Sequence, residues 1–417
     1  MTAKLAIVIL FVAIACNNGE SPAETGTVRV TVAFSGTDPD PTRPIVSLDD
    51  TVSRQGVGAP VTFEAAAGTH QITLHGLHAR CVRDGDATQT WAVVSGEITD
   101  VAFSVSCRDV DQLAMSTLDS TTGDPVLSIV DADGQRWHHI FDGTASMAVP
   151  AWSPDGRRLA FRYHLDPDQD RGAIYLVNAD GTELRKIWSD PVYTPAGISW
   201  SPDGARLAVI ADYDAPGSNF DYNKLVLMDT DGSNVVETDP QNGGVSVPRW
   251  APDGTRFVFA ASVRAGDNDG GLIGTFTADR QGAELHQIAT FAYAVDWSRD
   301  GTRIVLANGG LVTVRPDGSD PVTIPGCDFC VAARWSPDGT RLLVDNLNDV
   351  RVVSLDGTPQ WSVNTDGIYG RPSWSGSGML VAWMNSSGIG TTIVTADGSN
   401  PRVLGFISGF PGPAWRP

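Results

Sequence analysis

Three polar stretches of the chain hold the residue types best suited to chemistry or binding. They are residues 163–172, 211–223 and 263–271, where aspartates gather with aromatic residues and one histidine. Acidic groups beside aromatic rings suit a basic or polyhydroxy partner, or a divalent cation at the rim, and a histidine near carboxylates can act as a general base. The candidate binding residues are His164, Asp166, Asp168, Asp170, Asp212, Tyr213, Asp214, Phe220, Asp221, Tyr222, Asp267 and Asp269.

The sequence patterns of common active sites are absent from the chain. It contains no nucleophile elbow, no glycine-rich phosphate loop and no H-E-x-x-H. His70, His75 and His78 do not share one strand face, so we expect exposed histidines there rather than metal ligands. We therefore favour a binding protein with no cofactor. The alternative is a polysaccharide lyase or hydrolase that uses His164 as its base.

Composition favours many short strands over long helices. The chain has 417 residues, is 41% hydrophobic, and contains 44 glycines and 26 prolines, which suit strands joined by tight turns. Its formal net charge is −20. An acidic surface repels phosphate backbones, which argues against a nucleic-acid partner.

The N-terminus predicts export. The apolar run Leu5–Ala15 is too short to span a bilayer as a helix but fits the core of a secretory signal. Cys16 follows Ala15 directly, and this junction resembles a bacterial lipoprotein signal, in which the cysteine carries the lipid; it departs in having Ala13 where leucine is usual. The alternative is an ordinary export signal cut near Ala15. We expect a signal peptide over residues 1–15 and a lipidated tether over residues 16–26.

The remaining four cysteines predict two disulfides in an oxidising compartment. Cys81 and Cys107 each stand at the end of a predicted strand of the N-terminal region, and we pair them. Cys327 and Cys330 form a C-x-x-C. Without a surrounding βαβ pattern or further thiols, it predicts a local disulfide rather than redox chemistry or a zinc site.

Residues 27–108 predict a small β-sandwich. The segment Thr27–Phe34 alternates apolar and polar residues with the period of a half-buried strand, and four similar runs follow between turn residues. Short strands at this spacing indicate antiparallel sheets. The order of valines, glycines and cysteines loosely resembles transthyretin-like or PEGA-like modules of surface lipoproteins.

One pentapeptide recurs through the rest of the chain. WSPDG begins at Trp152, Trp200 and Trp335, with variants at Trp250, Trp297 and Trp374 and a truncated copy at Trp415. The tryptophans lie 38 to 50 residues apart, the length of a four-stranded propeller blade. Apolar residues follow seven and nine positions after each of the first six, so one face of the next strand is buried. The pentapeptide itself predicts a strand end and a hairpin turn.

A second turn recurs between the third and fourth strands of each repeat and is found seven times, as in Asp131–Gly134. These turns resemble calcium loops but lack the glutamate at the twelfth position, so we expect no calcium there. The surplus turn near the start and the surplus tryptophan at the end together complete one blade. We predict an all-β protein with a seven-bladed propeller over residues 109–417, closed by a C-terminal strand that pairs with residues 112–117; six or eight blades are the alternatives.

The pattern P-x-W-S-P-D-G-x-x-L-x-F followed by D-G resembles the TolB-type propeller repeat. The resemblance implies the fold; the family includes periplasmic and surface adaptors, protease-associated propellers and a few lyases. It departs from TolB itself, whose partner domain is α/β and whose ring has six blades. We expect a monomeric, lipid-anchored protein of the bacterial cell envelope that binds a protein or glycan through its long loops, with the lipid as its only membrane contact.

Overall fold

The computed structural model describes most of the chain as β-strands and turns. The described residues are 25–36, 45–49, 52–55, 60–75, 77, 81–107, 111–118, 121–122, 124–142, 147–163, 172–213, 223–238, 246–265, 269–365, 372–384, 390–404 and 414–417. Within them no helix is long and apolar enough to cross a membrane.

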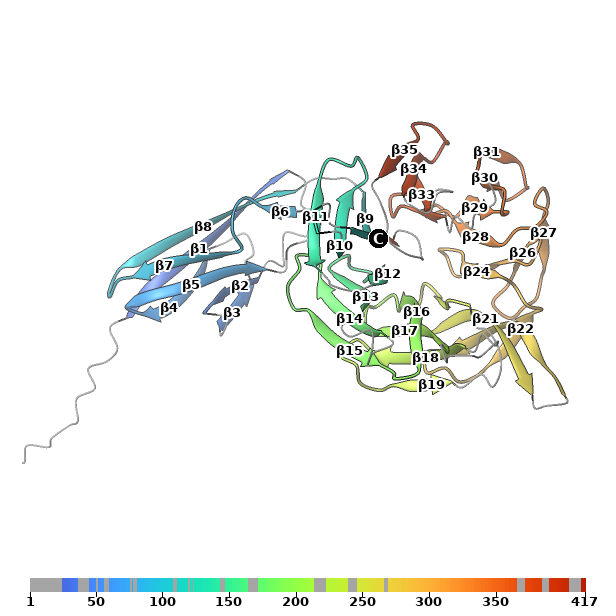
Figure 1. The fold of residues 1–417 in the computed structure, drawn as a ribbon, viewed down its shortest axis with the longest axis horizontal. Coiled ribbons are helices and arrows are strands. Elements are labelled where there is room, and N and C mark those ends of the chain that lie inside the picture. Colours follow the sequence, from blue (N-terminus) through green and yellow to red (C-terminus); the bar gives the residue numbers. More distant parts are fainter. Residues whose placement is uncertain are drawn as a thin grey trace, which may run out of the picture.

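Residues 25–107 form two four-stranded sheets, here called the two-sheet unit (Figure 1). One sheet has the order β4-β1-β8-β6 and the other β3-β2-β5-β7. Their inner faces share one apolar core that includes Val28, Val46, Ile72 and Phe103. The strands are β1 (Thr25–Gly36), β2 (Ile45–Leu48), β3 (Val52–Gln55), β4 (Val61–Ala66), β5 (Gly68–His75), β6 (Cys81–Arg83), β7 (Thr88–Val93) and β8 (Ile98–Cys107).

The pairing in this unit differs from the antiparallel arrangement expected from the sequence. Strands β1 and β8 pair in parallel, with Thr27 beside Ile98. The first and last strands of the unit are connected through the whole second sheet rather than by a hairpin, and a long connection permits parallel pairing. Strands β2, β3 and β6 were also not expected, because they are only three or four residues long.

Residues 112–415 form seven four-stranded antiparallel sheets arranged as propeller blades (Figure 1). This confirms the seven blades counted from the repeats. Blades I to IV consist of β36 (Ala414–Trp415), β9 (Gln112–Leu118), β10 (Pro125–Asp131) and β11 (Trp137–Asp142); β12 (Met147–Trp152), β13 (Arg158–Tyr163), β14 (Ala173–Asn178) and β15 (Arg185–Ser189); β16 (Tyr193–Trp200), β17 (Arg206–Tyr213), β18 (Asn223–Asp229) and β19 (Val236–Thr238); and β20 (Arg249–Trp250), β21 (Arg256–Ala265), β22 (Asp269–Asp279) and β23 (His286–Ala289).

Blades V to VII have the same four-stranded order. They consist of β24 (Ala294–Trp297), β25 (Ile304–Ala307), β26 (Leu311–Val314) and β27 (Val322–Ile324); β28 (Ala332–Trp335), β29 (Arg341–Asp345), β30 (Asp349–Ser354) and β31 (Pro359–Asn364); and β32 (Ser373–Trp374), β33 (Leu380–Met384), β34 (Thr391–Thr395) and β35 (Arg402–Leu404).

Each WSPDG copy ends the first strand of a blade and turns into the second. In blade III, Ser201 Oγ donates to Asp203 Oδ1 at 2.6 Å, and Gly204 takes a φ of +67°, which an L side chain rarely adopts. The apolar residues seven and nine positions after each tryptophan are all buried, with exposed fractions of 0 to 7%. The repeated sequence is therefore explained by turn geometry and by packing between blades.

The repeat tryptophans also join neighbouring blades. Trp200 Nε1 in blade III donates to the carbonyl oxygen of Ala151 in blade II at 3.0 Å, and Trp152 Nε1 reaches Ala414 in blade I at 3.2 Å. Trp297, Trp374 and Trp415 make the corresponding bonds. Since each bond crosses to the preceding blade, together they stabilise the ring.

The C-terminal strand closes the ring. Strand β36 pairs with β9 through Ala414 beside Ala114 and Trp415 beside Leu113. Blade I thus combines three N-terminal strands with one C-terminal strand, as the surplus turn and tryptophan predicted. Closure removes the unpaired strand edges of an open array.

The two-sheet unit lies beside blade I in Figure 1, where β6 approaches β11. Arg83 at the end of β6 is close enough to His138 of β11 for the two charges to interact. Burial and the neighbouring Arg83 both lower the pKa of His138.

Candidate functional site

The two ends of the propeller differ in the segments they carry. In a four-stranded meander, the first and third turns lie at one end, and the second turn and the link between blades lie at the other. We call the first end the DG-turn face, because it holds the WSPDG and D-G turns, and the second the variable-loop face. The three polar stretches belong to the variable-loop face.

The structure describes few of the twelve binding residues expected from the sequence. Only Asp212 has a described side chain; for Tyr213 and Asp269 only the strand backbone is described, at the end of β17 and the start of β22. The others lie outside the described residues: His164, Asp166, Asp168, Asp170, Asp214, Phe220, Asp221, Tyr222 and Asp267. This set therefore stays a prediction.

Asp212 lies half-buried near the end of β17, across from Thr194 and Asn223. Arg162 of the preceding blade is close by and donates to the carbonyl oxygen of Pro195 at 3.0 Å. Burial lowers the pKa of Arg162, and the charge of Asp212 opposes that shift. The Asp212 carboxylate therefore partly balances a half-buried cation between blades II and III.

A buried lysine lies at the base of the loop that contains residues 214–222. Lys224, at the start of β18, is only 6% exposed. Its Nζ is 2.7 Å from Asp190 Oδ2 and 2.8 Å from Glu237 Oε2, and it lies 4.3 Å from the centre of the Tyr193 ring. A buried ammonium needs such partners, since its desolvation is costly.

The protonation states of Lys224 and Asp190 indicate what this cluster can do chemically. Burial acts to lower the pKa of Lys224, but hydrogen bonds to Asp190 and Glu237 outweigh it and raise the pKa. Burial likewise acts to raise the pKa of Asp190, but Lys224 and the N–H groups of Val192 and Tyr193 lower it overall. Both groups stay charged at neutral pH. The cluster therefore holds the start of β18 to the neighbouring segments and is not a general base.

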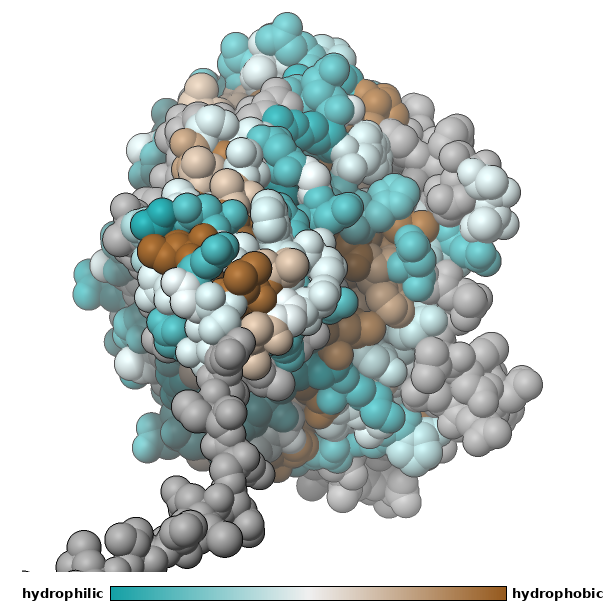
Figure 2. Space-filling view, turned by 90° about the vertical axis from the view of Figure 1, so that its left-hand side faces the viewer, coloured by the Kyte–Doolittle hydropathy of each residue, from teal (hydrophilic) through white to brown (hydrophobic). Residues whose placement is uncertain are grey.

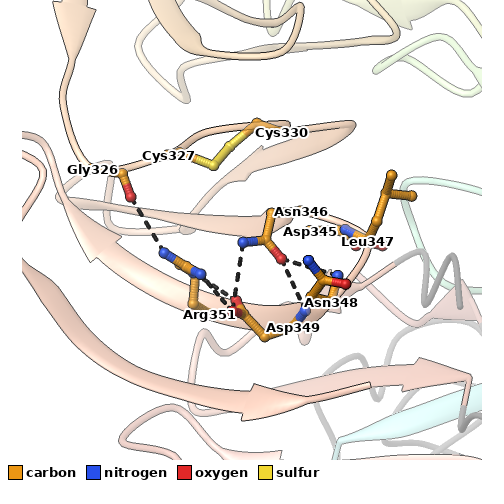
Figure 3. The surroundings of a disulfide bond; sticks show 9 residues. All are labelled: Gly326, Cys327, Cys330, Asp345, Asn346, Leu347, Asn348, Asp349 and Arg351. Atoms are coloured by element: carbon orange, nitrogen blue, oxygen red, sulfur yellow. Dashed lines mark hydrogen bonds and ion pairs between the residues drawn. A yellow bond between two sulfur atoms is a disulfide. The ribbon is translucent and has the colours of Figure 1, made fainter. Parts of the chain in front are cut away.

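Cys327 and Cys330 form a disulfide in the link between blades V and VI (Figure 3). Both cysteines are buried, and the backbone of Cys330 exchanges two hydrogen bonds of 3.1 Å with Gly309 in the second turn of blade V. Between the cysteines, Phe329 is 75% exposed. The disulfide thus closes the link on itself, and the two backbone hydrogen bonds join the link to the turn at Gly309.

The neighbouring turn is held by its own side chains. Arg351 forms an ion pair with Asp349 and donates to the carbonyl oxygen of Gly326 at 3.2 Å (Figure 3). Asn346 Oδ1 accepts from the N–H groups of Asn348 and Asp349. For the other expected disulfide, the register places Cys81 opposite Cys107. Their side chains lie outside the described part, so that pair stays a prediction.

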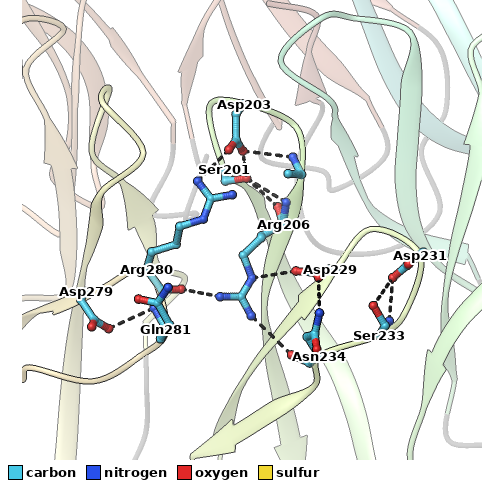
Figure 4. Close-up of polar contacts among 11 residues, drawn as sticks. Ser201, Asp203, Arg206, Asp229, Asp231, Ser233, Asn234, Asp279, Arg280 and Gln281 are labelled. Atoms are coloured by element: carbon cyan, nitrogen blue, oxygen red, sulfur yellow. Dashed lines mark hydrogen bonds and ion pairs between the residues drawn. The ribbon is translucent and has the colours of Figure 1, made fainter.

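The DG-turn face has a shallow depression between blades III and IV (Figure 4). Arg206 Nε is 3.1 Å from Asp229, and Arg206 Nη1 donates to the carbonyl oxygen of Arg280 at 2.7 Å. Arg280 in turn is 2.6 Å from Asp203. Burial acts to raise the pKa of Asp203, but hydrogen bonds from Arg280, Ser201 and Ala205 lower it to about 2. These polar groups are paired with one another, and the contacts of Arg280 with Arg206 and Asp203 join blade IV to blade III. The depression therefore has a structural role.

These arginines were missed in the sequence, although their spacing is regular. Five repeats carry an arginine six positions after the tryptophan: Arg158, Arg206, Arg256, Arg303 and Arg341. Arg158 lies over the Trp200 ring of the next blade at 5.2 Å, and Arg341 lies over Trp374 at 5.1 Å. The positions are therefore structural.

No group of three or more histidine, cysteine, aspartate or glutamate side chains that could hold a metal ion exists among the described residues. His70 contacts Asp49 at 2.7 Å, and His75 contacts Ser47 at 3.2 Å. His78 lies outside the described residues. The divalent cation considered for the acidic loops is not tested, because those loops are not described.

The fold and these sites define a closed seven-bladed β-propeller preceded by a two-sheet unit. Residues 113–311 match the PD40 model, described as a TolB beta propeller domain. This part of the propeller is therefore similar to a TolB beta propeller domain.

Curated relatives match parts of this propeller. The Tol-Pal system protein TolB of Alcanivorax borkumensis is 34% identical over 139 residues, which are 30% of this chain and 31% of the relative. An uncharacterized peptidase of Bacillus subtilis, YuxL, is 28% identical over 163 residues, 32% of this chain and 24% of the relative. The chain thus matches less than a third of the length of these relatives.

Among solved structures, the periplasmic gluconolactonase of Pseudomonas aeruginosa superposes with a TM-score of 0.54. The match covers 74% of this chain and 99% of that protein, at 15% sequence identity. At this identity the likeness extends to the fold alone.

Proposed function

We propose that the protein is an exported, lipid-anchored protein of the bacterial cell envelope whose propeller binds a protein or glycan through the variable-loop face. One observation carries the proposal: the two ends of the ring are built differently. The DG-turn face consists of short turns closed by their own hydrogen bonds, whereas the other face carries long polar segments between strand ends. The Lys224 cluster holds the strand end that follows one of these segments.

Three further points support this proposal. A loop that binds a partner loses less conformational entropy on binding when its base is fixed in advance. The disulfide between Cys327 and Cys330 suits an oxidising compartment outside the cytoplasm. A relative of part of the propeller is named Tol-Pal system protein TolB, and 31% of its length is matched.

Loop replacement with crosslinking tests the proposed binding face. Residues 164–171, 214–222 and 266–268 are each replaced by a short Gly-Ser linker in the intact lipoprotein. Crosslinking in the native envelope is then compared with the unaltered protein. We expect the crosslinked partner to be lost in these variants. A matched variant on the other face is Leu285→Ser, since Leu285 is 64% exposed after a D-G turn.

Capture that survives all three replacements contradicts this binding face. A polysaccharide lyase or hydrolase would instead show turnover of polysaccharide that is lost in His164→Ala, with or without divalent metal. That result would replace the binding function by the enzymatic alternative. Equal loss of capture in Leu285→Ser would place the partner on the DG-turn face.

A further inference from the structure

The turn between β7 and β8 is joined firmly to the first described residues of the chain. Gly96 N donates to the carbonyl oxygen of Thr25, and Thr27 N donates to that of Glu97, both at 2.9 Å. A methyl group on Gly26 would lie 2.2 Å from the carbonyl oxygen of Val94, so the two segments are in close contact. We call residues 25–27 and 94–98 together the tether end.

Aliphatic side chains are exposed at the tether end. Val94 is 50% exposed and Ile98 is 58% exposed. Ile98 follows the turn, and the register places it beside Thr27. Figure 2 looks at this end of the molecule and shows hydrophobic residues at its surface. Single exposed aliphatic residues are common, but here two of them flank one turn beside the start of the described chain.

Charges at the tether end do not favour attraction to anionic lipid. Glu97 lies in the turn, and Glu64 accepts a hydrogen bond of 3.0 Å from Thr27 Oγ1. The nearest described arginine, Arg29, is paired with Asp100. A contact made by this surface therefore depends on its apolar groups and not on basic residues.

The position of the tether end relates it to the expected anchor. Cys16 precedes Thr25 by nine residues. At about 3.3–3.6 Å per residue, that length reaches no more than about 32 Å. Figure 1 shows the start of the two-sheet unit at the end remote from the propeller. Anchoring also raises the local concentration of the membrane, so a weak apolar contact becomes effective.

We propose that the tether end is a second membrane contact, in which Val94 and Ile98 enter the interfacial layer of the bilayer when Cys16 is anchored. This inference rests on the lipid anchor of the proposed function. The contact orients the two-sheet unit with its tether end on the membrane. The propeller is thereby held away from the lipid surface, with its variable-loop face open to a partner.

Fluorescence at matched positions tests this contact. An environment-sensitive NBD label is attached to Val94→Cys in the full-length lipoprotein, reconstituted in phosphatidylcholine vesicles. The control label is at Val322→Cys on outer strand β27, where the native side chain is 45% exposed. We expect a blue shift and a severalfold gain in emission at position 94 and none at position 322. The gain should persist in high salt, because apolar contacts are not screened.

Ile98→Asp provides a second readout. It replaces an exposed side chain, so the fold is retained, which circular dichroism checks. The emission gain at position 94 should be lost while the protein still floats with the vesicles. If the protein floats with the vesicles but the labels at positions 94 and 322 emit equally, the proposed membrane contact is wrong. The lipid anchor is then still supported.

A separate attachment distinguishes failure of the contact from failure of the anchor. If the lipoprotein does not float, the lipid anchor of the proposed function is wrong. The same labelled chain is then attached through a hexahistidine tag placed at position 16 to nickel-chelating vesicles. An emission gain there supports the contact, and its absence overturns it. If an unlabelled second copy of the chain quenches the NBD emission at position 94 in the absence of vesicles, the tether end binds another copy of the protein, and the membrane contact is contradicted.

Discussion

At the scale of single residues, the indole N–H groups of the repeat tryptophans distinguish one blade interface from another. Trp200 Nε1 donates to Ala151 in the preceding blade at 3.0 Å. Trp250 and Trp335 are equally buried, but their Nε1 atoms find no acceptor among the described residues. The same tryptophan position therefore occurs with and without the indole hydrogen bond. A substitution at a bonded position can be compared with the same substitution at an unbonded one.

Substitution by phenylalanine measures this bond. Trp200→Phe and Trp250→Phe remove similar volume, but only the first leaves a carbonyl oxygen without its donor. We expect Trp200→Phe to lower the free energy of unfolding by about 1–2 kcal/mol more than Trp250→Phe does. Urea unfolding followed by tryptophan emission and circular dichroism measures the difference. Equal losses would mean that the indole bond adds nothing to stability.

The pair of His70 and Asp49 predicts a pH dependence in the two-sheet unit. Hydrogen bonds to Asp49 and to the carbonyl oxygen of Ala66 raise the pKa of His70. Hydrogen bonds from the Gln71 N–H and from His70 lower the pKa of Asp49. The contribution of His70 is present below its unfolded pKa of about 6.5 and is lost as pH rises through the higher folded value. The contribution of Asp49 is lost as pH falls through its lowered folded value.

The pair therefore stabilises most between about pH 4 and pH 6.5. Asp49→Asn should reduce the gain in free energy of unfolding on going from alkaline to mildly acidic pH, by less than about 1 kcal/mol because the pair is partly exposed. Thermal unfolding followed at several pH values measures this change. Proton NMR of His70 gives its pKa directly. A value at or below that of an unfolded chain would contradict the assignment. His286→Gln is the control, since among the described residues its ring has one hydrogen-bond partner, the Asp317 carbonyl oxygen at 3.3 Å.

At the scale of elements, the D-G turns hold a strained residue that the sequence did not reveal. Glu183, Asn234, Glu284, Asp320 and Asn400 all follow the turn glycine by two positions and have φ between +51° and +56°. Asparagine tolerates this region better than glutamate does. We expect Glu183→Asn and Glu284→Asn each to raise stability by a few tenths of a kcal/mol, up to about 1. Calorimetry should show no such gain for Glu183→Gln, which removes the charge but keeps the strain.

The disulfide predicts a local effect on the variable-loop face. Its loop is very short, so reduction should change global stability little. Reduction should speed amide exchange at Cys330 and Gly309, because their paired hydrogen bonds depend on this link. Tyr293 N, which donates to Ala307 at 2.8 Å in the preceding link, is the internal control. Unchanged exchange at Cys330 would show that the backbone bridge holds without the disulfide.

Repetition explains how much of these elements could be predicted from the sequence. Each strand and turn of the blades has copies elsewhere, so one ambiguous segment is resolved by its equivalents. Strand β2 has no copy, and its four residues give too short a pattern. The Lys224 cluster was missed because Asp190, Lys224 and Glu237 come from three separate segments that only the fold brings together. The long loops differ from blade to blade, and repetition says nothing about them.

At the scale of the whole molecule, closure makes the two chain halves depend on each other. Blade I has its fourth strand only when β36 joins β9, and in the described part of the chain two residue pairs connect those strands. Arg416 supplements them. Its backbone N donates to Gln112, its Nε donates to Gly156 at 3.2 Å, and its guanidinium lies 5.7 Å from the Trp152 ring. It thus occupies the place that an arginine six positions after the tryptophan takes in other blades.

Arg158 provides the matched comparison for this closure. It lies over the next tryptophan, Trp200, and donates to the next turn glycine, Gly204, at 3.3 Å. Arg158→Ala and Arg416→Ala therefore remove equivalent contacts, each worth about 1–3 kcal/mol. Arg158 belongs to β13, which is paired on both sides, whereas β36 is paired on one side only. We expect Arg416→Ala to be the more destabilising of the two, and hydrogen exchange to show fraying of β36 and β9 in that variant alone. Equal exchange at β36 in both variants would show that strand pairing alone closes the ring.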